Sequence, residues 1–286
     1  MTQVGGRNVM DNILTDVGVY DIASDAWTTP FQLEPIMAKS DFGMFSYNAN
    51  LYMMGGYDST YTASNSTFKL DMSTLAVTEL SNMAESRGDI YAERIGNVVV
   101  VTGGFTHEDY FCQAKNSTER YDISQDSWVK MNDMNINRGD QALVALENYL
   151  FALGGEYKIT CTGDAAESTT PADEVDVLDL STASTTTAWT KLDDIPDNRF
   201  RFTGEAHPPT DTIYIFGGQK YYDVDCDCYA VSDKVLAYHV HHDTFSQKLV
   251  DTASTKSAGF EVTSLGGFNI FGTTVVFTFF VVLSLI

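Results

Sequence analysis

The sequence is poor in basic residues. Only 17 lysines and arginines stand against 39 aspartates and glutamates in a chain of 286 residues, so the formal net charge at pH 7 is −22. A surface with such an excess of negative charge repels phosphate backbones and anionic membrane surfaces. We therefore exclude nucleic acid as a partner.

The sequence also lacks recognisable catalytic and cofactor-binding motifs. It contains no Ser/His/Asp order and no phosphate-binding glycine loop. His239 and His241, in the run His-Val-His-His, would share one face of a strand and could form a metal pair, but we favour an exposed strand end for them. The sequence thus predicts no catalytic, cofactor-binding or metal-binding residues and no cofactor.

What the chain does have is a glycine pair that returns five times, at intervals of about 50 residues. The pairs are Gly5-Gly6, Gly55-Gly56, Gly103-Gly104, Gly154-Gly155 and Gly217-Gly218. A repeat of this length predicts an array of supersecondary units, each too small to bury its own apolar face.

Each repeat unit carries the pattern of short strands. Four of the glycine pairs follow an apolar run, such as Val98–Thr102, which predicts a buried strand. A second strand follows the next loop, with a bulky residue seven positions further on. These pairs are Tyr20 and Trp27, Phe68 and Leu75, Tyr121 and Trp128, and Tyr238 and Phe245. In the fourth unit Leu178 and Trp189 lie further apart, because residues 181–187 are inserted.

A short turn with Met or Ile before a basic residue ends the unit, as in Met83 to Arg87. This order of features resembles the kelch repeat over roughly residues 4 to 250. The resemblance implies an all-β, kelch-type β-propeller of four-stranded blades, with about five blades visible and the first one incomplete. It also implies that the glycine pairs and three tryptophans are structural. We expect Trp27, Trp128 and Trp189 to be largely buried in equivalent places between blades, and the repeat arginine to bind blade-edge carbonyls or carboxylates.

The repeat and the composition of the C-terminus together divide the chain into three parts: a propeller at residues 1–250, a linker or spacer at 251–269, and a hydrophobic membrane segment or anchor signal at 270–286. The first blade lacks its innermost strand and most of its second. Either the sequence is truncated at its N-terminus, which we favour, or C-terminal strands close the ring.

The hydrophobic segment reads IFGTTVVFTFFVVLSLI, without a charge. Its length is at the short limit for a bilayer span, which needs ~20 residues. Three small residues, Ser257-Ala258-Gly259, precede it across a spacer. This is the pattern of a glycolipid (GPI) anchor signal, with Ser257 as the candidate attachment site. A retained membrane helix is the alternative.

Two sequons and four cysteines indicate an extracellular protein. Asn65 and Asn116 begin the sequons, and we expect both to be exposed and glycosylated. The cysteines are Cys112, Cys161, Cys226 and Cys228. All four lie in loops after a glycine pair, which favours disulfides, with Cys112 and Cys161 as the first pair. Cys226 and Cys228 could bond each other, but that ring would be strained, so pairing with the other two stays open. A zinc site there would need a wider gap.

Two Arg-Gly-Asp sequences, at 87–89 and 138–140, suggest adhesion on a cell-surface protein. Both stand at the same repeat position, where the other units have Lys39-Ser40-Asp41 and Arg199-Phe200-Arg201. The repeat itself therefore explains the arginine, and we set the adhesion interpretation aside.

These features together predict a membrane-attached extracellular propeller that binds a protein or carbohydrate ligand through its loops and the membrane through its C-terminus. The candidate binding loops are residues 106–117, 157–174 and 220–233. The functional step depends on analogy between folds. The alternative is an extracellular metal-dependent oxidase or carbohydrate-active enzyme on the same scaffold.

Overall fold

The computed structural model describes residues 2–8, 10–109, 111–158, 169–182 and 184–248. In these ranges the chain is built of β-strands and four 3-10 helices of three residues each, so the predicted all-β class is confirmed. The short helices are Pro35–Met37, His107–Asp109, Pro208–Thr210 and Val240–His242. The predicted linker, the hydrophobic segment and Ser257 lie outside the described residues.

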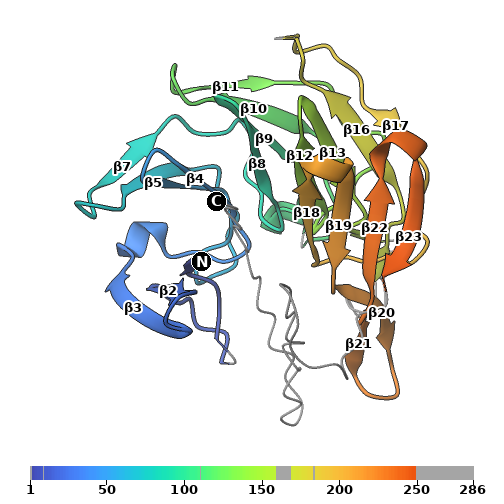
Figure 1. Ribbon diagram of the computed structural model, residues 1–286. Coiled ribbons are helices and arrows are strands. Elements are labelled where there is room, and N and C mark those ends of the chain that lie inside the picture. The colour runs from blue at the N-terminus through green and yellow to red at the C-terminus, as the bar shows by residue number, and fades with distance from the viewer. Residues whose placement is uncertain (1, 9, 110, 159–168, 183, 249–286) are drawn as a thin grey trace.

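Five antiparallel sheets follow one another around a common axis as blades (Figure 1). Blade 1 contains β1 (Thr2–Val4), β2 (Asp16–Asp21) and β3 (Ala26–Gln32). Blade 2 contains β4 (Gly43–Tyr47), β5 (Asn50–Met54), β6 (Thr67–Asp71) and β7 (Val77–Leu80). Blade 3 contains β8 (Ala92–Ile95), β9 (Val98–Thr102), β10 (Thr118–Asp122) and β11 (Ser127–Lys130). Blade 4 contains β12 (Ala142–Leu146), β13 (Tyr149–Leu153), β16 (Val175–Asp179) and β17 (Thr190–Lys191). Blade 5 contains β18 (Thr203–His207), β19 (Thr212–Phe216), β22 (Val235–His239) and β23 (Thr244–Lys248).

The first strand of each complete blade lies innermost. β8 contacts β4 on one side and β12 on the other, and β12 contacts β18. Blade 1 has three strands, and its β1 precedes Gly5-Gly6 as β5 precedes Gly55-Gly56. Within the ranges that the structure describes, blade 1 therefore has no innermost strand, as the sequence predicted.

One end of the blades carries the loops that follow the glycine pairs. The segments that lead into the innermost strands lie at the same end, which we call the loop face. Two hairpins are inserted into these loops. They are β14 (Glu156–Lys158) with β15 (Thr169–Pro171), and β20 (Gln219–Asp223) with β21 (Cys228–Val231). The hairpins contact each other, and the second extends away from the blades (Figure 1).

The hydrophobic core is divided among the seams between blades. In one seam, Val99, Val101 and Tyr121 of blade 3 pack against Phe45 and Met54 of blade 2. Each fully buried side chain of this kind contributes ~1.5–3 kcal/mol relative to leaving it exposed. The apolar residues of a blade are buried against those of its neighbour. A repeat unit therefore needs a neighbouring unit, and the sequence specifies an array.

Of the four residue pairs with the seven-residue offset, three lie opposite each other on neighbouring strands and one does not. Tyr121 lies opposite Trp128, and the equivalent pairs in blades 1 and 5 are also opposite. In blade 2, however, Leu70 lies opposite Val77, so Phe68 and Leu75 do not face each other. Leu75 instead occupies the exposed turn with φ of 61°. Because residues 68 and 70 are both apolar, the sequence alone allows either of them to be aligned with the tyrosine of the other repeats.

The tryptophans differ in burial. Trp189 is 5% exposed, and its indole N–H donates to the carbonyl of Asn132 on blade 3. Trp128 is half-buried, and its N–H donates to the carbonyl of Ser81 beside blade 2. Trp27 is 48% exposed, so its predicted burial is wrong. Each buried tryptophan packs on the preceding blade, and among the described residues no sheet precedes blade 1.

Candidate functional site

The repeat arginines join the loops within each blade. Arg87 is fully buried and donates to the carbonyls of Gly103 and Ser117 at 2.8 and 2.9 Å and to Glu119 at 3.0 Å. Arg138 and Arg199 are equally buried and bind the equivalent carbonyls of blades 4 and 5. The predicted partners of the repeat arginine are confirmed, and such burial leaves an adhesion receptor no access to it.

The glycine pairs join each blade to the next. The N–H of Gly104 donates to the carbonyl of Arg138 at 3.0 Å, and Gly56 and Gly155 do the same one blade earlier and later. Gly103 has φ of +70°, and a Cβ there would lie 2.2 Å from the Arg138 carbonyl oxygen. Only glycine permits both the backbone conformation and this approach.

After two of the glycine pairs, an aromatic residue packs on the next blade. The ring of Phe105 covers Gly139, where a Cβ would lie 2.5 Å from it, and the ring of Tyr57 covers Gly88 at 2.3 Å. The glycine of each Arg-Gly-Asp sequence is therefore required by an aromatic ring of the preceding blade.

The third residue of the same motif lies where the innermost strand of each blade begins. These residues are Asp41, Asp89, Asp140 and Arg201, with φ of 54°, 55°, 52° and 53°. The N–H of Asp140 donates to the carbonyl of Asp89, and that of Arg201 to the carbonyl of Asp140. With Glu156 they form what we call the axial cluster. Sequence reasoning missed it, although the shared repeat position was the available signal.

One guanidinium serves several carboxylates in the axial cluster. Nε of Arg201 donates to Oδ2 of Asp140 at 2.9 Å, and its Nη2 lies 3.6 Å from Oε1 of Glu156. Asp89 accepts a hydrogen bond from the Tyr57 hydroxyl at 2.8 Å. Although burial opposes its charge, Asp140 and Glu156 raise the pKa of Arg201 well above its ordinary value.

The carboxyl groups of the axial cluster also have raised pKa values. Burial, together with the charges of Asp140 and Asp41, raises the pKa of Asp89 well above its ordinary value. Burial likewise raises the pKa of Asp41, and it raises the pKa of Glu156 to about 7. Burial and the neighbouring carboxyl groups therefore favour the protonated, uncharged forms of Asp41, Asp89 and Glu156.

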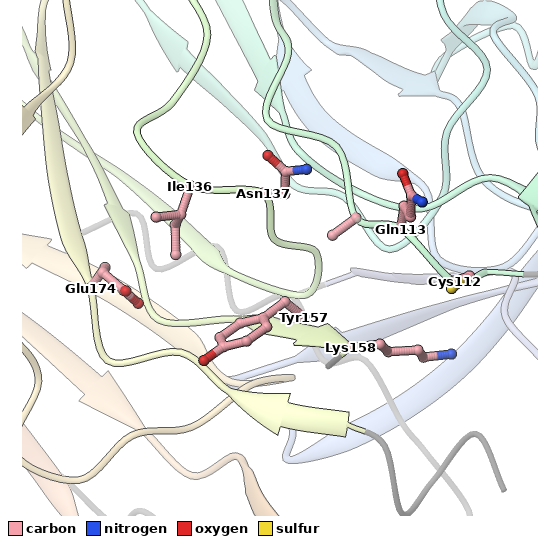
Figure 2. A pocket seen from close by; sticks show the side chains of 8 residues that line it. Cys112, Gln113, Ile136, Asn137, Tyr157, Lys158 and Glu174 are labelled. Carbon is pink, nitrogen blue, oxygen red and sulfur yellow. The ribbon is translucent and has the colours of Figure 1, made fainter. Parts of the chain in front are cut away.

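A groove of about 440 Å³ lies on the loop face between blades 3 and 4 (Figure 2). The side chains around it are Cys112, Gln113, Ala114, Ile136, Asn137, Tyr157, Lys158 and Glu174. They come from two of the three candidate binding loops and the turn before Arg138. The lining mixes apolar and polar groups, as binding surfaces for polypeptides do.

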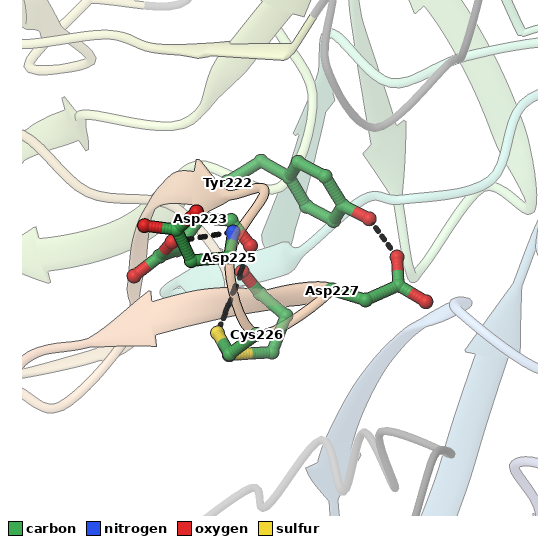
Figure 3. The surroundings of a disulfide bond; sticks show 6 residues. Tyr222, Asp223, Asp225, Cys226 and Asp227 are labelled. Atoms are coloured by element: carbon green, nitrogen blue, oxygen red, sulfur yellow. Dashed lines mark hydrogen bonds between the residues drawn. A yellow bond between two sulfur atoms is a disulfide. The ribbon is translucent and has the colours of Figure 1, made fainter.

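The third candidate loop forms the β20–β21 hairpin, closed at its tip by a disulfide between Cys226 and Cys228 (Figure 3). The structure thus selects one of the pairings that the sequence left open. Cys112 is also disulfide-bonded, and its predicted partner Cys161 lies outside the described residues.

The hairpin is held by an aromatic contact and has exposed apolar side chains. The ring of Tyr229 packs edge-on against Phe200, with centroids 5.3 Å apart. Tyr221, Val224 and Val231 are 61%, 66% and 73% exposed, among the most exposed large apolar side chains of the described residues. This loop therefore presents apolar surface on a fixed support.

The sequon asparagines have a structural role. Nδ2 of Asn65 donates to the carbonyl of Met83 at 2.9 Å, and Nδ2 of Asn116 to that of Met134 at 3.3 Å. Both side chains are half-buried, so their predicted exposure is wrong: the repeat uses this amide to hold the turn before its arginine. Glycosylation of these residues stays a prediction.

The histidines at the end of β22 have protein partners. His239 hydrogen-bonds with Thr212 and Ser246, and His241 pairs with Asp211 at 2.8 Å. Within the described ranges, no three His, Cys, Asp or Glu side chains are placed to hold a metal ion. No helix in the same ranges has the length and apolar character needed to cross a bilayer.

Comparison with known proteins agrees with the repeat. Residues 92–135, which span the strands of blade 3, match the Kelch motif. Kelch-like protein 15 of Homo sapiens is 28% identical over 112 residues, which cover 38% of this chain and 18% of that protein. The Kelch repeat protein M-T8 of Myxoma virus (strain Lausanne) is 21% identical over 203 residues, covering 70% of this chain and 35% of that protein. Each match thus spans about a third or less of the relative.

A solved structure shares the fold. The structure of YjhT superposes with a TM-score of 0.63 at 15% identity, covering 85% of this chain and 82% of that one. The predicted propeller fold is confirmed, and residues 92–135 match the predicted kelch motif.

Proposed function

Because the chain is a kelch-repeat β-propeller, we propose that it is a protein-binding module whose loop face forms the binding surface. The observation that carries this proposal is the β20–β21 hairpin, which exposes Tyr221, Val224 and Val231 and is held by the contact between Phe200 and Tyr229. Exposed apolar residues on an ordered support mark interaction sites, because their burial by a partner costs little ordering entropy.

The groove beside this hairpin supports the same face. It lies between blades 3 and 4, and the two inserted hairpins contact each other next to it. A protein partner fits this surface better than a carbohydrate does, because two exposed valines offer a sugar no hydrogen bonds. In the part of the chain that the structure describes, no observation favours the enzymatic alternative.

We further propose that the module is held at the extracellular face of a membrane through its C-terminal segment. The support comes from the sequence: the uncharged run at 270–286 and the small residues at 257–259. The acidic propeller would remain off an anionic lipid surface.

The binding proposal is tested by affinity capture from cells that make the protein. The hairpin variant Tyr221→Ser/Val231→Ser changes two exposed side chains of the loop face. The control Tyr149→Ser changes a residue that is 42% exposed at the opposite end of blade 4. We expect a partner that the natural protein and the control retain and the hairpin variant loses. A partner retained by all three proteins, or none retained by the natural protein, would contradict the proposal.

A further inference from the structure

The disulfide at the tip of the β20–β21 hairpin closes a turn that the chain also builds in other places. Cys226 lies in the turn at residues 224–227, and Cys228 is the first strand residue after it (Figure 3). The Tyr222 hydroxyl donates to the carboxylate of Asp227 across this turn. The same hydrogen bond closes a turn in three blades, between Tyr20 and Asp25, Tyr121 and Asp126, and Tyr238 and Asp243.

The three turns in the blades have this geometry without cysteine. Their aspartates have φ of 51°, 47° and 48°, and Asp227 has φ of 54°. Asp122 lies opposite Ser127 in blade 3 as Asp223 lies opposite Cys228 in the hairpin. The residues at the two cysteine positions are Ser24 and Ala26, Gln125 and Ser127, and His242 and Thr244. The tyrosine, the aspartate and the left-handed backbone therefore specify the turn, and the disulfide is not needed to form it.

The disulfide also contributes little to folding and is open to solvent. It joins residues two positions apart, and the stabilisation by a cross-link falls with the length of the loop that it closes. Cys226 is exposed and Cys228 is half-buried. Exposed disulfides are the ones that exchange with thiols, whereas structural disulfides resist reduction. These two cysteines therefore have the properties of a reactive pair.

The charges beside the pair select the thiol that reaches it. Asp223, Asp225 and Asp227 alternate with the residues around the two cysteines, and the whole chain has a net charge of −22. Negative charge slows the encounter with an anionic reagent and speeds the encounter with a cationic one. A neutral or cationic thiol is therefore the favoured reactant.

We propose that Cys226 and Cys228 form a thiol–disulfide exchange site for neutral and cationic thiols. The thiolate of the first thiol attacks Sγ of Cys226, the more exposed residue of the pair. The bond between the two cysteines breaks, a mixed disulfide forms at Cys226, and Sγ of Cys228 leaves as a thiolate that takes up a proton. A second thiol attacks the mixed disulfide, which releases the disulfide of the two reagent molecules and leaves Cys226 as a thiol. Two electrons thus pass from two thiols to the pair.

The test measures reduction of the pair in the folded protein. The purified protein is incubated with 2-aminoethanethiol, 2-mercaptoethanol or 3-mercaptopropanoate, which are cationic, neutral and anionic. Free thiols are blocked with an alkylating reagent at set times, and mass spectrometry follows the peptide that contains Cys226 and Cys228. Each rate is divided by the rate of the same thiol with 2-hydroxyethyl disulfide, which is uncharged. We expect the pair to be reduced while the protein stays folded, about tenfold faster by the cationic than by the anionic thiol on this relative scale.

The variant Asp225→Asn removes one charge beside the pair. The turn is held by the side chains of Asp223 and Asp227, so it should persist in this variant. We expect the ratio of the cationic to the anionic rate to fall about twofold to threefold. The control Glu147→Gln removes the same charge from an exposed turn at the opposite end of blade 4 and should leave the ratio unchanged.

The double variant Cys226→Ser/Cys228→Ser tests whether the disulfide is structural. It should unfold at the same temperature as the natural protein, because the blades form this turn without cysteine. Three results would overturn the inference: no reduction of the pair before the protein unfolds, equal relative rates for the three thiols, or a double serine variant that unfolds at a much lower temperature or does not fold. The inference does not depend on the proposed function, and the hairpin variant used for partner capture keeps both cysteines, so the two proposals fail separately.

Discussion

The hydroxyl of Tyr121 donates a 2.8 Å hydrogen bond to Oδ1 of Asp126, in the turn that follows its strand. The same Asp126 oxygen accepts the N–H of Ser81 from blade 2 at 2.9 Å, so the pair joins two blades. Tyr238 and Asp243 repeat the arrangement in blade 5, where Asp243 accepts the N–H of Asp193. Blade 2 has lost both members together, with Leu70 and Leu75 in their places. The tyrosine and the aspartate therefore act as one unit.

Replacing Tyr121 with Phe should lower the free energy of unfolding by about 1 kcal/mol, the usual value of one hydrogen bond. The ring, which is 1% exposed, would keep its packing. Chemical denaturation measures the change, and Tyr149→Phe at an exposed position is the control. In a double-mutant cycle, Tyr121→Phe should cost less once Asp126 is Ala. Additive effects would contradict the inferred pair.

The loss of unfolding free energy on replacing each of the three tryptophans with Ala should increase with its contact with the preceding blade. Trp189→Ala removes a side chain that is 5% exposed and should cost ~3–5 kcal/mol. Trp27→Ala, at 48% exposure, should cost less than about 1 kcal/mol. Trp128→Ala should lie between them. Equal losses for Trp27 and Trp189 in urea denaturation would show that blade 1 is covered in solution.

Gly139→Ala should destabilise the protein by ~1–3 kcal/mol, because the new methyl group meets the Phe105 ring. The double variant Phe105→Ala/Gly139→Ala should be more stable than the sum of the two single effects predicts, since the smaller residue leaves room for the methyl group. Thermal unfolding of the four proteins measures this coupling. Without such coupling, the glycine of the Arg-Gly-Asp motif would need another explanation.

The sequence predicted the parts of the fold that depend on one repeat at a time. Gly103-Gly104 and the offset from Tyr121 to Trp128 are local, and the structure has them as expected. Contacts between blades were harder to predict. The exposure of Trp27 depends on a neighbour, and the half-burial of Asn116 depends on the turn before Arg138.

The axial cluster was missed for the same reason. Asp41, Asp89 and Asp140 are separated by whole blades in the sequence, and only closure around an axis brings them together. Their neighbours Arg87 and Arg138 were explained by the repeat, and the aspartates beside them were then treated as part of the same structural motif. The hairpin β20–β21 was predicted only as a variable loop, although Tyr222, Asp227 and Tyr229 have the same spacing as Tyr121, Asp126 and Trp128.

Stability should fall as the pH rises from about 4.5 to about 7. Burial raises the pKa of Glu93 from its ordinary value of 4.5 to about 7, so in this range the folded state keeps a proton that the unfolded state has lost. The contribution is complete below pH 4.5 and is lost by pH 7. Glu93→Gln should reduce the slope of unfolding free energy against pH in this window and leave the part that Glu156 contributes. Glu147→Gln, at an exposed turn, should leave the curve unchanged; an equal slope in all three proteins would remove Glu93 as its source.

Cleavage of the chain near Ser257 should leave a lipid-anchored propeller. The prediction rests on the small residues at 257–259, the spacer after them and the uncharged run at 270–286. The protein, expressed behind a functional secretion signal, should be released from cells by a phosphatidylinositol-specific phospholipase. A matched variant, Ser257→Pro/Ala258→Pro, should not reach this enzyme-releasable form, because the small residues at the attachment site are lost. If the phospholipase releases nothing and a peptide containing Phe279 is recovered from the membrane fraction, the segment is a retained helix. The β20–β21 hairpin would stay exposed in either case, since it belongs to the propeller and does not depend on how the chain is attached.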